Sequence, residues 1–237
     1  MANKKILLGL TTITEGEWRN KVKEIDELGL KEIALFPTCL AYNERQELYK
    51  LLEKTNLEKI PHVHIREEDF TTAEIKYLID KWKTEVFNMH VREETQKFID
   101  KLGDLKRILF VENTDVIQDN FEDIAKQVGG LCLDFAHWED HGHLRRIKEY
   151  EALDELVKKY KTGLNHISAI KKELTVFHER RTGEDLYILN SHDLSDFSEL
   201  DYVKKYKNYL ADIISIELEN PLKRQLEVKK YLEEIIF

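Results

Sequence analysis

Residues 108–137 read ILFVENTDVIQDNFEDIAKQVGGLCLDFAH, and the pattern of this stretch decides the fold. Two short apolar runs, Ile108–Glu112 and Leu131–Phe135, lie on either side of an amphipathic segment, Phe121–Val128. Strands that are buried on both faces of a parallel sheet lack alternation and consist of nearly continuous apolar residues. The stretch therefore predicts a strand–helix–strand unit whose two strands are parallel.

The same alternation continues outward in both directions along the 237 residues. The other predicted strands are Ile6–Leu10, Glu32–Phe36, Ile60–Ile65, Val86–Val91, Gly163–Ile167 and Ile213–Leu218. The other predicted helices are Trp18–Leu28, Glu44–Lys54, Thr72–Trp82, Glu93–Leu102, Leu144–Tyr160, Asp196–Leu210 and Leu222–Ile235. Eight units of about 30 residues each have the size of βαβ units. We predict an α/β fold, a single parallel (β/α)8 TIM barrel over residues 1–237. An open dinucleotide-binding sheet is disfavoured, because the turn after the first strand lacks the glycine fingerprint.

One connection is longer than this pattern requires, the segment from Ser168 to Ser195. Connections longer than about 15 residues in compact domains are usually functional or disordered. This one leaves the carboxyl end of the strand Gly163–Ile167, the end at which TIM barrels place their active sites. We expect an active-site lid or wall that carries His192 inward, with Asp185–Asn190 extended.

Composition narrows the function classes. The net charge is −9, from 37 basic and 46 acidic residues, which disfavours nucleic acid as a partner because phosphate contacts supply most of its binding energy. Cys39 and Cys132 are too far apart to indicate a zinc module or a disulfide framework. No apolar run is long enough for a signal peptide or a membrane span. We expect a cytoplasmic enzyme with no membrane partner, and homo-oligomerisation stays open.

Ionisable side chains fall at the ends of the predicted strands. Glu112, Asp134 and Glu217 each follow apolar residues, and a buried carboxylate must be paired or bind a metal. Imidazoles lie in or close after the strands and in the long connection: His62, His64, His90, His137, His166 and His192. A single strand histidine is more often a hydrogen-bonded core residue, but several converging on one barrel mouth indicate a site. Carboxylates with imidazoles suit a divalent metal, Mn, Zn, Fe or Mg.

Four short motifs resemble the metal-binding strand ends of the xylose isomerase-like TIM-barrel superfamily. They are Val111-Glu112-Asn113-Thr114, Leu133-Asp134-Phe135-Ala136-His137, Asn165-His166 and Ile216-Glu217. The superfamily contains sugar isomerases and epimerases, and also endonuclease IV-type apurinic-site nucleases (AP endonuclease family 2). The resemblance implies four metal ligands: Glu112, Asp134, His166 and Glu217. It also implies acid–base catalysis by Glu112 and Glu217, and contact of His137 with substrate or a second metal.

The nuclease branch of the superfamily has further metal-binding histidines. His62 or His64, together with His90 and His192, resemble these ligands, but Asn190 stands where the nuclease pattern has an aspartate. Three functions therefore stay open. We rank a metal-dependent isomerase or epimerase of a sugar-like small molecule above a metal-dependent phosphodiesterase, and both above a non-catalytic ligand-binding barrel. Basic side chains that could contact an anionic substrate group are Arg66, Arg92, Lys171, Lys172, Arg180 and Arg181.

Overall fold

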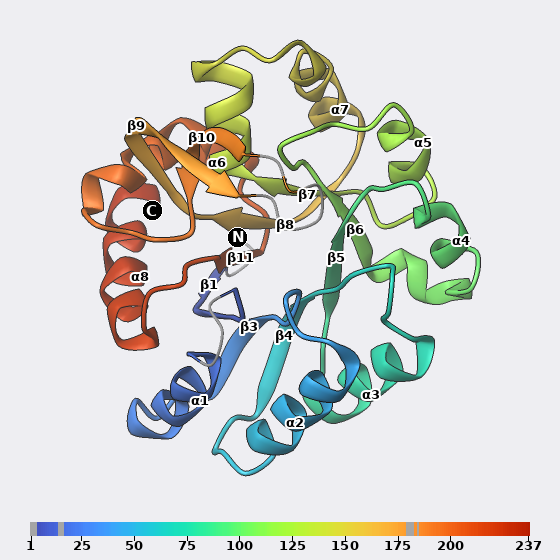
Figure 1. Cartoon of the computed structure of the whole chain (residues 1–237), viewed down its shortest axis with the longest axis vertical. Helices are drawn as coiled ribbons and strands as arrows, with labels where there is room; N and C mark the ends of the chain where they lie inside the picture. The colour runs from blue at the N-terminus through green and yellow to red at the C-terminus, as the bar shows by residue number, and fades with distance from the viewer. Residues whose placement is uncertain (1–3, 14–16, 179–182, 184) are drawn as a thin grey trace.

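A computed structural model describes residues 4–13, 17–178, 183 and 185–237, and it confirms the predicted parallel barrel (Figure 1). The barrel strands are β1 (Lys5–Leu7), β2 (Gly9–Thr11), β3 (Glu32–Phe36), β4 (Lys59–His64), β5 (Val86–His90), β6 (Leu109–Glu112), β7 (Leu131–Asp134), β8 (Thr162–Ile167) and β11 (Ile213–Ile216). They pair in the order β1-β11-β8-β7-β6-β5-β4-β3-β2, every pair parallel. All carboxyl ends therefore face one mouth of the barrel.

The first predicted strand is present in two pieces, and these pieces close the barrel. β1 pairs with β11 and β2 pairs with β3, while the carbonyl of Leu8 between them accepts a hydrogen bond from Ala34 N at 2.8 Å. Gly9 donates to Gln225 Oε1 at 2.8 Å and accepts from its Nε2 at 3.0 Å. A Cβ at Gly9 would lie 2.0 Å from the carbonyl oxygen of Ile216, so only glycine fits where the strand divides.

Helices surround the sheet, as Figure 1 shows. They are α1 (Trp18–Glu27), α2 (Tyr42–Leu52), α3 (Thr72–Trp82), α4 (Thr95–Ile99), α5 (Phe121–Ala125), α6 (Phe135–His137), α7 (Leu153–Lys159) and α8 (Leu222–Ile236). The 3₁₀ segments are Gly103–Ile108, Lys148–Tyr150 and Phe197–Tyr209, and Trp138–Leu144 is a π-helix. No helix among the described residues is long and apolar enough to cross a membrane.

Four helix predictions are wrong in part. The predicted helices Glu93–Leu102 and Phe121–Val128 are α-helical only over Thr95–Ile99 and Phe121–Ala125. Of the predicted helix Leu144–Tyr160 only Leu153–Lys159 is α-helical, and the predicted helix Asp196–Leu210 is a 3₁₀ segment. The helical turns after β7 were not predicted. They begin there because the Asp134 side chain accepts a hydrogen bond from His137 N at 2.8 Å, an N-cap directly at the strand end.

The long connection is a β-hairpin rather than a loop. β9 (Ala169–His178) pairs antiparallel with β10 (Asp185–Ser191), and the predicted extended stretch Asp185–Asn190 is confirmed. Figure 1 shows both strands beside β8 and outside the barrel sheet. Their Thr, Val, Tyr and Ile residues have high strand propensity, and each strand supplies the other's hydrogen-bonding partner. Arg180 and Arg181 lie outside the described residues.

The barrel interior has an apolar lower layer and a polar upper layer. The apolar layer consists of Leu7, Ala34, Phe36, Phe110, Cys132, Leu164 and Ile213, all buried. The ring of Phe36 meets the imidazoles of His62 and His166 edge-on, with centroids 5.4 and 5.2 Å apart. The Phe36 ring thus packs directly against the polar side chains at the mouth of the barrel.

Candidate metal centre

Four buried side chains from different strands converge above the Phe36 ring. His64 of β4, Glu112 of β6, His166 of β8 and Glu217, which follows β11, each bring a ligand atom within 4.8 Å of the others. We call these four residues the central cluster. His166 Nδ1 lies 3.1 Å from Glu112 Oε1 and 2.9 Å from Glu217 Oε2. They meet because parallel strands deliver their last residues to one end of a barrel.

The donor set of this cluster fits a metal ion. Several buried polar atoms have no hydrogen-bond partner among the described residues, among them His64 Nδ1, His166 Nε2 and Asp134 Oδ2. A buried polar atom without a partner costs roughly 1–3 kcal/mol, and more when the group is charged. A divalent cation would offset that cost, because carboxylate oxygens and neutral imidazole nitrogens are its usual ligands.

Asp134 lies beside the central cluster rather than inside it. Its carboxylate groups with Glu112 and His137, again with ligand atoms within 4.8 Å of one another. Of the four ligands that the resemblance implies, Glu112, His166 and Glu217 meet in the central cluster, and His64 is the fourth member. Glu112 belongs to both groups, so the two groups are adjacent and have this one residue in common.

His62 does not point into the site. Its Nδ1 lies 2.8 Å from Ser215 Oγ and its Nε2 lies 2.6 Å from Asn88 Oδ1. Because an amide oxygen only accepts, Nε2 carries the proton and Nδ1 accepts from the serine. Asn88 Nδ2 in turn donates to Glu112 Oε2. With both nitrogens used, His62 is unavailable as the metal ligand expected by resemblance; it holds Glu112 in place through Asn88.

Two further histidines face the same carboxylates from the cavity side. His90 Nε2 lies 3.7 Å from Glu112 Oε2, and His192 Nε2 lies 3.9 Å from Glu217 Oε1. His64 Nε2 is also 3.7 Å from Glu112 Oε2. The two oxygens of Glu112 therefore face different imidazoles, Oε1 toward His166 and Oε2 toward the other two.

The surroundings of Glu112 and Glu217 shift the pKa values of the two carboxyl groups in opposite directions. Burial raises the pKa of Glu112 above its ordinary value, and His166 offsets this only in part. Burial acts on Glu217 in the same sense, but His166 and the other nearby imidazoles bring its pKa well below the ordinary value. Burial also lowers the pKa of His64 far enough to keep its imidazole neutral, the form that binds metals.

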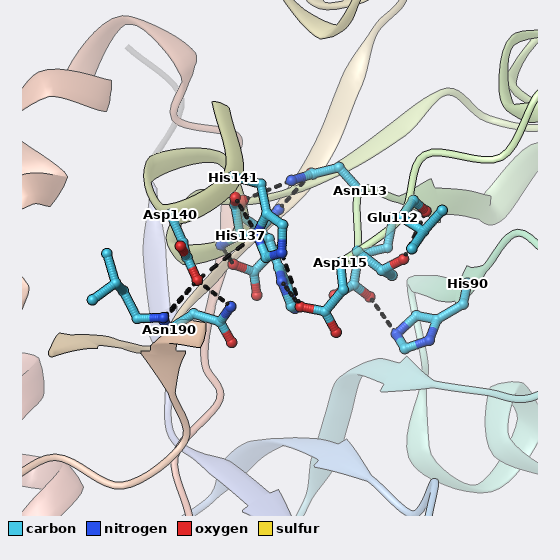
Figure 2. A network of polar contacts seen from close by, with 12 residues as sticks. His90, Glu112, Asn113, Asp115, His137, Asp140, His141 and Asn190 are labelled. Atoms are coloured by element: carbon cyan, nitrogen blue, oxygen red, sulfur yellow. Dashed lines mark hydrogen bonds and ion pairs between the residues drawn. The ribbon is translucent and has the colours of Figure 1, made fainter. Parts of the chain in front are cut away.

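Asp115, His137 and His141 form a third group of ligating atoms, and Figure 2 shows their side chains next to one another. Asp115 Oδ1 is 3.2 Å from His137 Nδ1 and 3.3 Å from His141 Nε2. Burial lowers the pKa of His137, but Asp115 and Asp134 together raise it to about 10. Asn190 lies next to this group, where its side-chain and backbone nitrogens donate to Asp140 Oδ2 at 2.9 and 3.0 Å.

Sequence reasoning missed the part that Asp115 and His141 play, along with the supporting role of Asn88. A sequence pattern that could have identified Asp115 and His141 exists, because Asp115 lies three residues after Glu112 and His141 lies one helical turn after His137. The role of Asn88 is invisible in sequence because it depends on which strands are neighbours.

A cavity of about 1110 Å³ opens above these groups and is walled by the hairpin of β9 and β10. Among the described lining residues the cationic ones are Arg92 and Lys171, each paired with a carboxylate: Arg92 Nη1 is 2.9 Å from Glu68 and Lys171 Nζ is 2.9 Å from Glu199. Arg66 does not line the cavity, since Leu40 O and Asp69 Oδ2 each accept from its Nη2 at 2.9 Å. The suggested substrate contact through Arg66 is therefore not supported.

Comparisons with known proteins show the fold. No protein-family model matches the chain, and no curated protein sequence matches it. The 3-deoxy-D-arabino-heptulosonate 7-phosphate (DAHP) synthase of Thermotoga maritima is similar in structure, with 9% identity, a TM-score of 0.54, and coverage of 99% of this chain and 69% of that chain. Weaker similarity reaches a xylose isomerase-like TIM barrel protein of Mycobacterium smegmatis, solved with magnesium, at 10% identity, a TM-score of 0.49, and coverage of 98% and 97%. At such identities the likeness concerns architecture alone.

Fold and site together define a class: a TIM barrel with buried carboxylate and imidazole side chains gathered at the carboxyl ends of its strands. These groups have the composition of a metal centre, and they lie on the floor of a cavity large enough for a small-molecule substrate.

Proposed function

We propose that this protein is a metal-dependent isomerase or epimerase of a small, sugar-like substrate. The observation that carries the proposal is the pair of buried glutamates, Glu112 and Glu217, which lie 3.1 and 2.9 Å from the same nitrogen of His166 and have pKa shifts of opposite sign. Paired carboxyl groups whose environments separate their pKa values are the usual sign of an acid and a base acting together.

The proposed metal ligands are Glu112, His166, Glu217 and His64, with Asp134 adjacent, and Mn, Zn or Mg as the ion. When bound, the ion would act as a Lewis acid that polarises a substrate carbonyl. Glu217, which stays ionised, accepts the proton from the carbon next to that carbonyl. Glu112, whose carboxyl is more readily protonated, returns a proton to the neighbouring carbon or the opposite face. The substrate gains and loses one proton, so no oxidant or further reactant is needed.

The cavity favours an uncharged polyol. Its described lining has seven acidic side chains: Glu93, Glu112, Asp115, Asp193, Glu199, Glu217 and Glu219. Because Arg92 and Lys171 are already paired, the described lining has no unpaired Arg or Lys for a phosphate group. Hydroxyl groups of a sugar, by contrast, can donate to these carboxylates and accept from a protonated His137.

A second candidate, metal-dependent hydrolysis of a phosphodiester, is favoured by one observation. Both His64 and His90 approach Glu112 Oε2, while Oε1 faces His166, so Glu112 could bridge two ions. Two ions about 3.5–4 Å apart are typical of phosphoesterases. The acidic cavity opposes this candidate, since a phosphodiester is itself an anion.

Exchange of a carbon-bound proton with solvent tests whether the protein is an isomerase or epimerase rather than a phosphodiesterase. The metal-loaded protein is incubated in D2O with a panel of ketoses and aldoses, and deuterium incorporation at carbon is followed by NMR. We expect incorporation with at least one substrate, and its loss in Glu217→Gln and Glu112→Gln variants that retain the native circular dichroism spectrum. Glu149→Gln, at an exposed position outside the cavity, is the matched control and should exchange like the unaltered protein.

Two other outcomes count against the proposal. Cleavage of bis(p-nitrophenyl) phosphate without any deuterium exchange would favour the phosphodiesterase. Tight metal binding with neither activity would favour the non-catalytic ligand-binding barrel.

A further inference from the structure

Asp115, His137 and His141 form a compact group beside the central cluster, and Asp115 and His141 take no part in that cluster. Asp115 lies in the loop after β6, and the two histidines lie one turn apart where β7 continues into α6 and the π-helix Trp138–Leu144. The imidazoles of His137 and His141 are buried, while Asp115 and His137 both line the cavity. A ligand held by the group would therefore be reachable from the cavity.

The spacing of the three ligand atoms matches a tetrahedral ion. Zinc bonds to histidine nitrogen and carboxylate oxygen are about 2.0–2.2 Å long, so the ligand atoms of a tetrahedral site lie roughly 3.4 Å apart. Asp115 Oδ1 lies 3.2 Å from His137 Nδ1 and 3.3 Å from His141 Nε2, and all three atoms lie within 4.8 Å of one another. The group therefore has almost the spacing of ligands around a cation.

The hydrogen bonds of this group leave one imidazole nitrogen unprotonated and two further polar atoms buried next to each other. His141 Nδ1 lies 3.2 Å from the backbone oxygen of His137, and a carbonyl only accepts, so Nδ1 carries the proton. His141 Nε2 is then unprotonated and faces the carboxylate oxygen of Asp115. Asp115 Oδ1 and His137 Nδ1 are themselves buried without a hydrogen-bond partner among the described residues. A cation here would replace the proton of His137 and bind Asp115 Oδ1 and His137 Nδ1, while His141 Nε2 would exchange its contact with Arg145 for the ion.

Neighbouring residues hold the group as the outer shell of a metal site does. A histidine ligand usually donates its second N–H to a carbonyl or carboxylate, as His141 does to the backbone of His137. Arg145 Nη2 lies 2.7 Å from His141 Nε2 and would have to give up this contact. Its other nitrogens donate to Asp140 Oδ1 at 2.5 Å and to the carbonyl of Tyr187 at 2.7 Å. The guanidinium would therefore remain hydrogen-bonded after losing the contact with His141.

We propose that Asp115, His137 and His141 form a second cation site, distinct from the central cluster and suited to a transition ion such as Zn²⁺. Two imidazoles and one carboxylate favour zinc-like ions over Mg²⁺, and three protein ligands leave a coordination position open. Asn190 is not a ligand, because Asp140 holds its side chain. Of its three residues the superfamily resemblance names His137 alone, and the site is independent of which reaction the central cluster performs.

Metal counting on the full-length chain tests this site. The protein is stripped with a chelator, dialysed, and titrated with Zn²⁺ alone by calorimetry, with Co²⁺ absorption as a second readout. Asp115→Asn and His141→Gln should each remove one binding event, weakening its Kd by more than about 100-fold, since loss of an outer-shell partner alone costs 10–100-fold. Glu217→Gln should impair the central cluster and leave this event intact. His143→Gln, exposed on the same π-helix, is the matched control and should bind as many ions as the unaltered protein.

The outcomes are exclusive. If Asp115→Asn and His141→Gln bind as many ions as the unaltered protein, the group is an ion pair and the proposal is wrong. If Glu217→Gln removes the event as well, the two groups form one site and the proposal of a distinct site is wrong. Should one variant fail to fold, as seen by circular dichroism, the other carries the test. Metal counts do not depend on turnover, so failure of the proposed isomerase reaction would leave this result unchanged.

Discussion

Replacing Asn113 by alanine tests how the barrel positions Asp134. Backbone pairing between β6 and β7 ends at Glu112 opposite Cys132. Beyond that point the Asn113 side chain continues the ladder: its Nδ2 donates to Asp134 O, and its Oδ1 accepts from Asp134 N, both at 2.9 Å. Asn113 and Asp134 are fully buried, so water cannot replace these bonds without opening the structure.

The magnitude follows from the two backbone groups that Asn113→Ala leaves unpaired. Each buried donor or acceptor without a partner costs about 1–3 kcal/mol, so the free energy of unfolding should fall by roughly 2–6 kcal/mol. For a domain of this size, each kcal/mol corresponds to a fall of about 2–4 °C in Tm, which gives a decrease of roughly 4–24 °C. Zn²⁺ affinity should fall about 10–100-fold as well, because Asp134 loses its support.

Urea denaturation followed by circular dichroism measures the first effect, and calorimetric titration measures the second. Thr114→Ala is the control on the same loop, because within the described part of the chain the threonine hydroxyl hydrogen-bonds only to the nearby Val116 carbonyl, at 3.2 Å. We expect this control to change stability by less than about 0.5 kcal/mol. An Asn113→Ala protein as stable as the Thr114→Ala protein would refute the argument that the side chain replaces a strand pairing.

Two further predictions concern the fold. Gly163→Ala should destabilise the protein by about 1–3 kcal/mol in urea denaturation, because a Cβ there would lie 2.1 Å from the Phe110 ring; unchanged stability would show that this ring moves freely. Burial lowers the pKa of Lys21 from 10.5 to about 8, so between these values the unfolded chain binds more protons and stability rises with pH. Lys21→Met should flatten that rise when unfolding is measured at pH 7.5 and 10, and identical pH dependence in both proteins would contradict the shift.

Much of the barrel could be predicted from local sequence because its determinants are local. Continuous apolar runs such as Leu131–Phe135 identify strands buried on both faces, and the positions of Glu112 and Glu217 at the ends of such runs place both at one mouth. The cytoplasmic location, a single domain and homo-oligomerisation stay predictions. The helix predicted over Leu144–Tyr160 is wrong over more than half its length, since only Leu153–Lys159 is α-helical, and the helical turns that the Asp134 N-cap begins directly after β7 depend on a side-chain contact that no apolar pattern shows.

Local sequence patterns were sufficient to predict the strand order, the mouth of the barrel and the residue types found there. Which of those residues face one another depends on the folded barrel. His62 and His64 are two positions apart on one strand, yet hydrogen bonds to Ser215 and Asn88 use both nitrogens of the first, while the second faces Glu112 and Glu217. The composition of each ligand group depends on distances across the barrel, which no local pattern encodes, because neighbouring strands and their side-chain contacts are set only when the sheet closes.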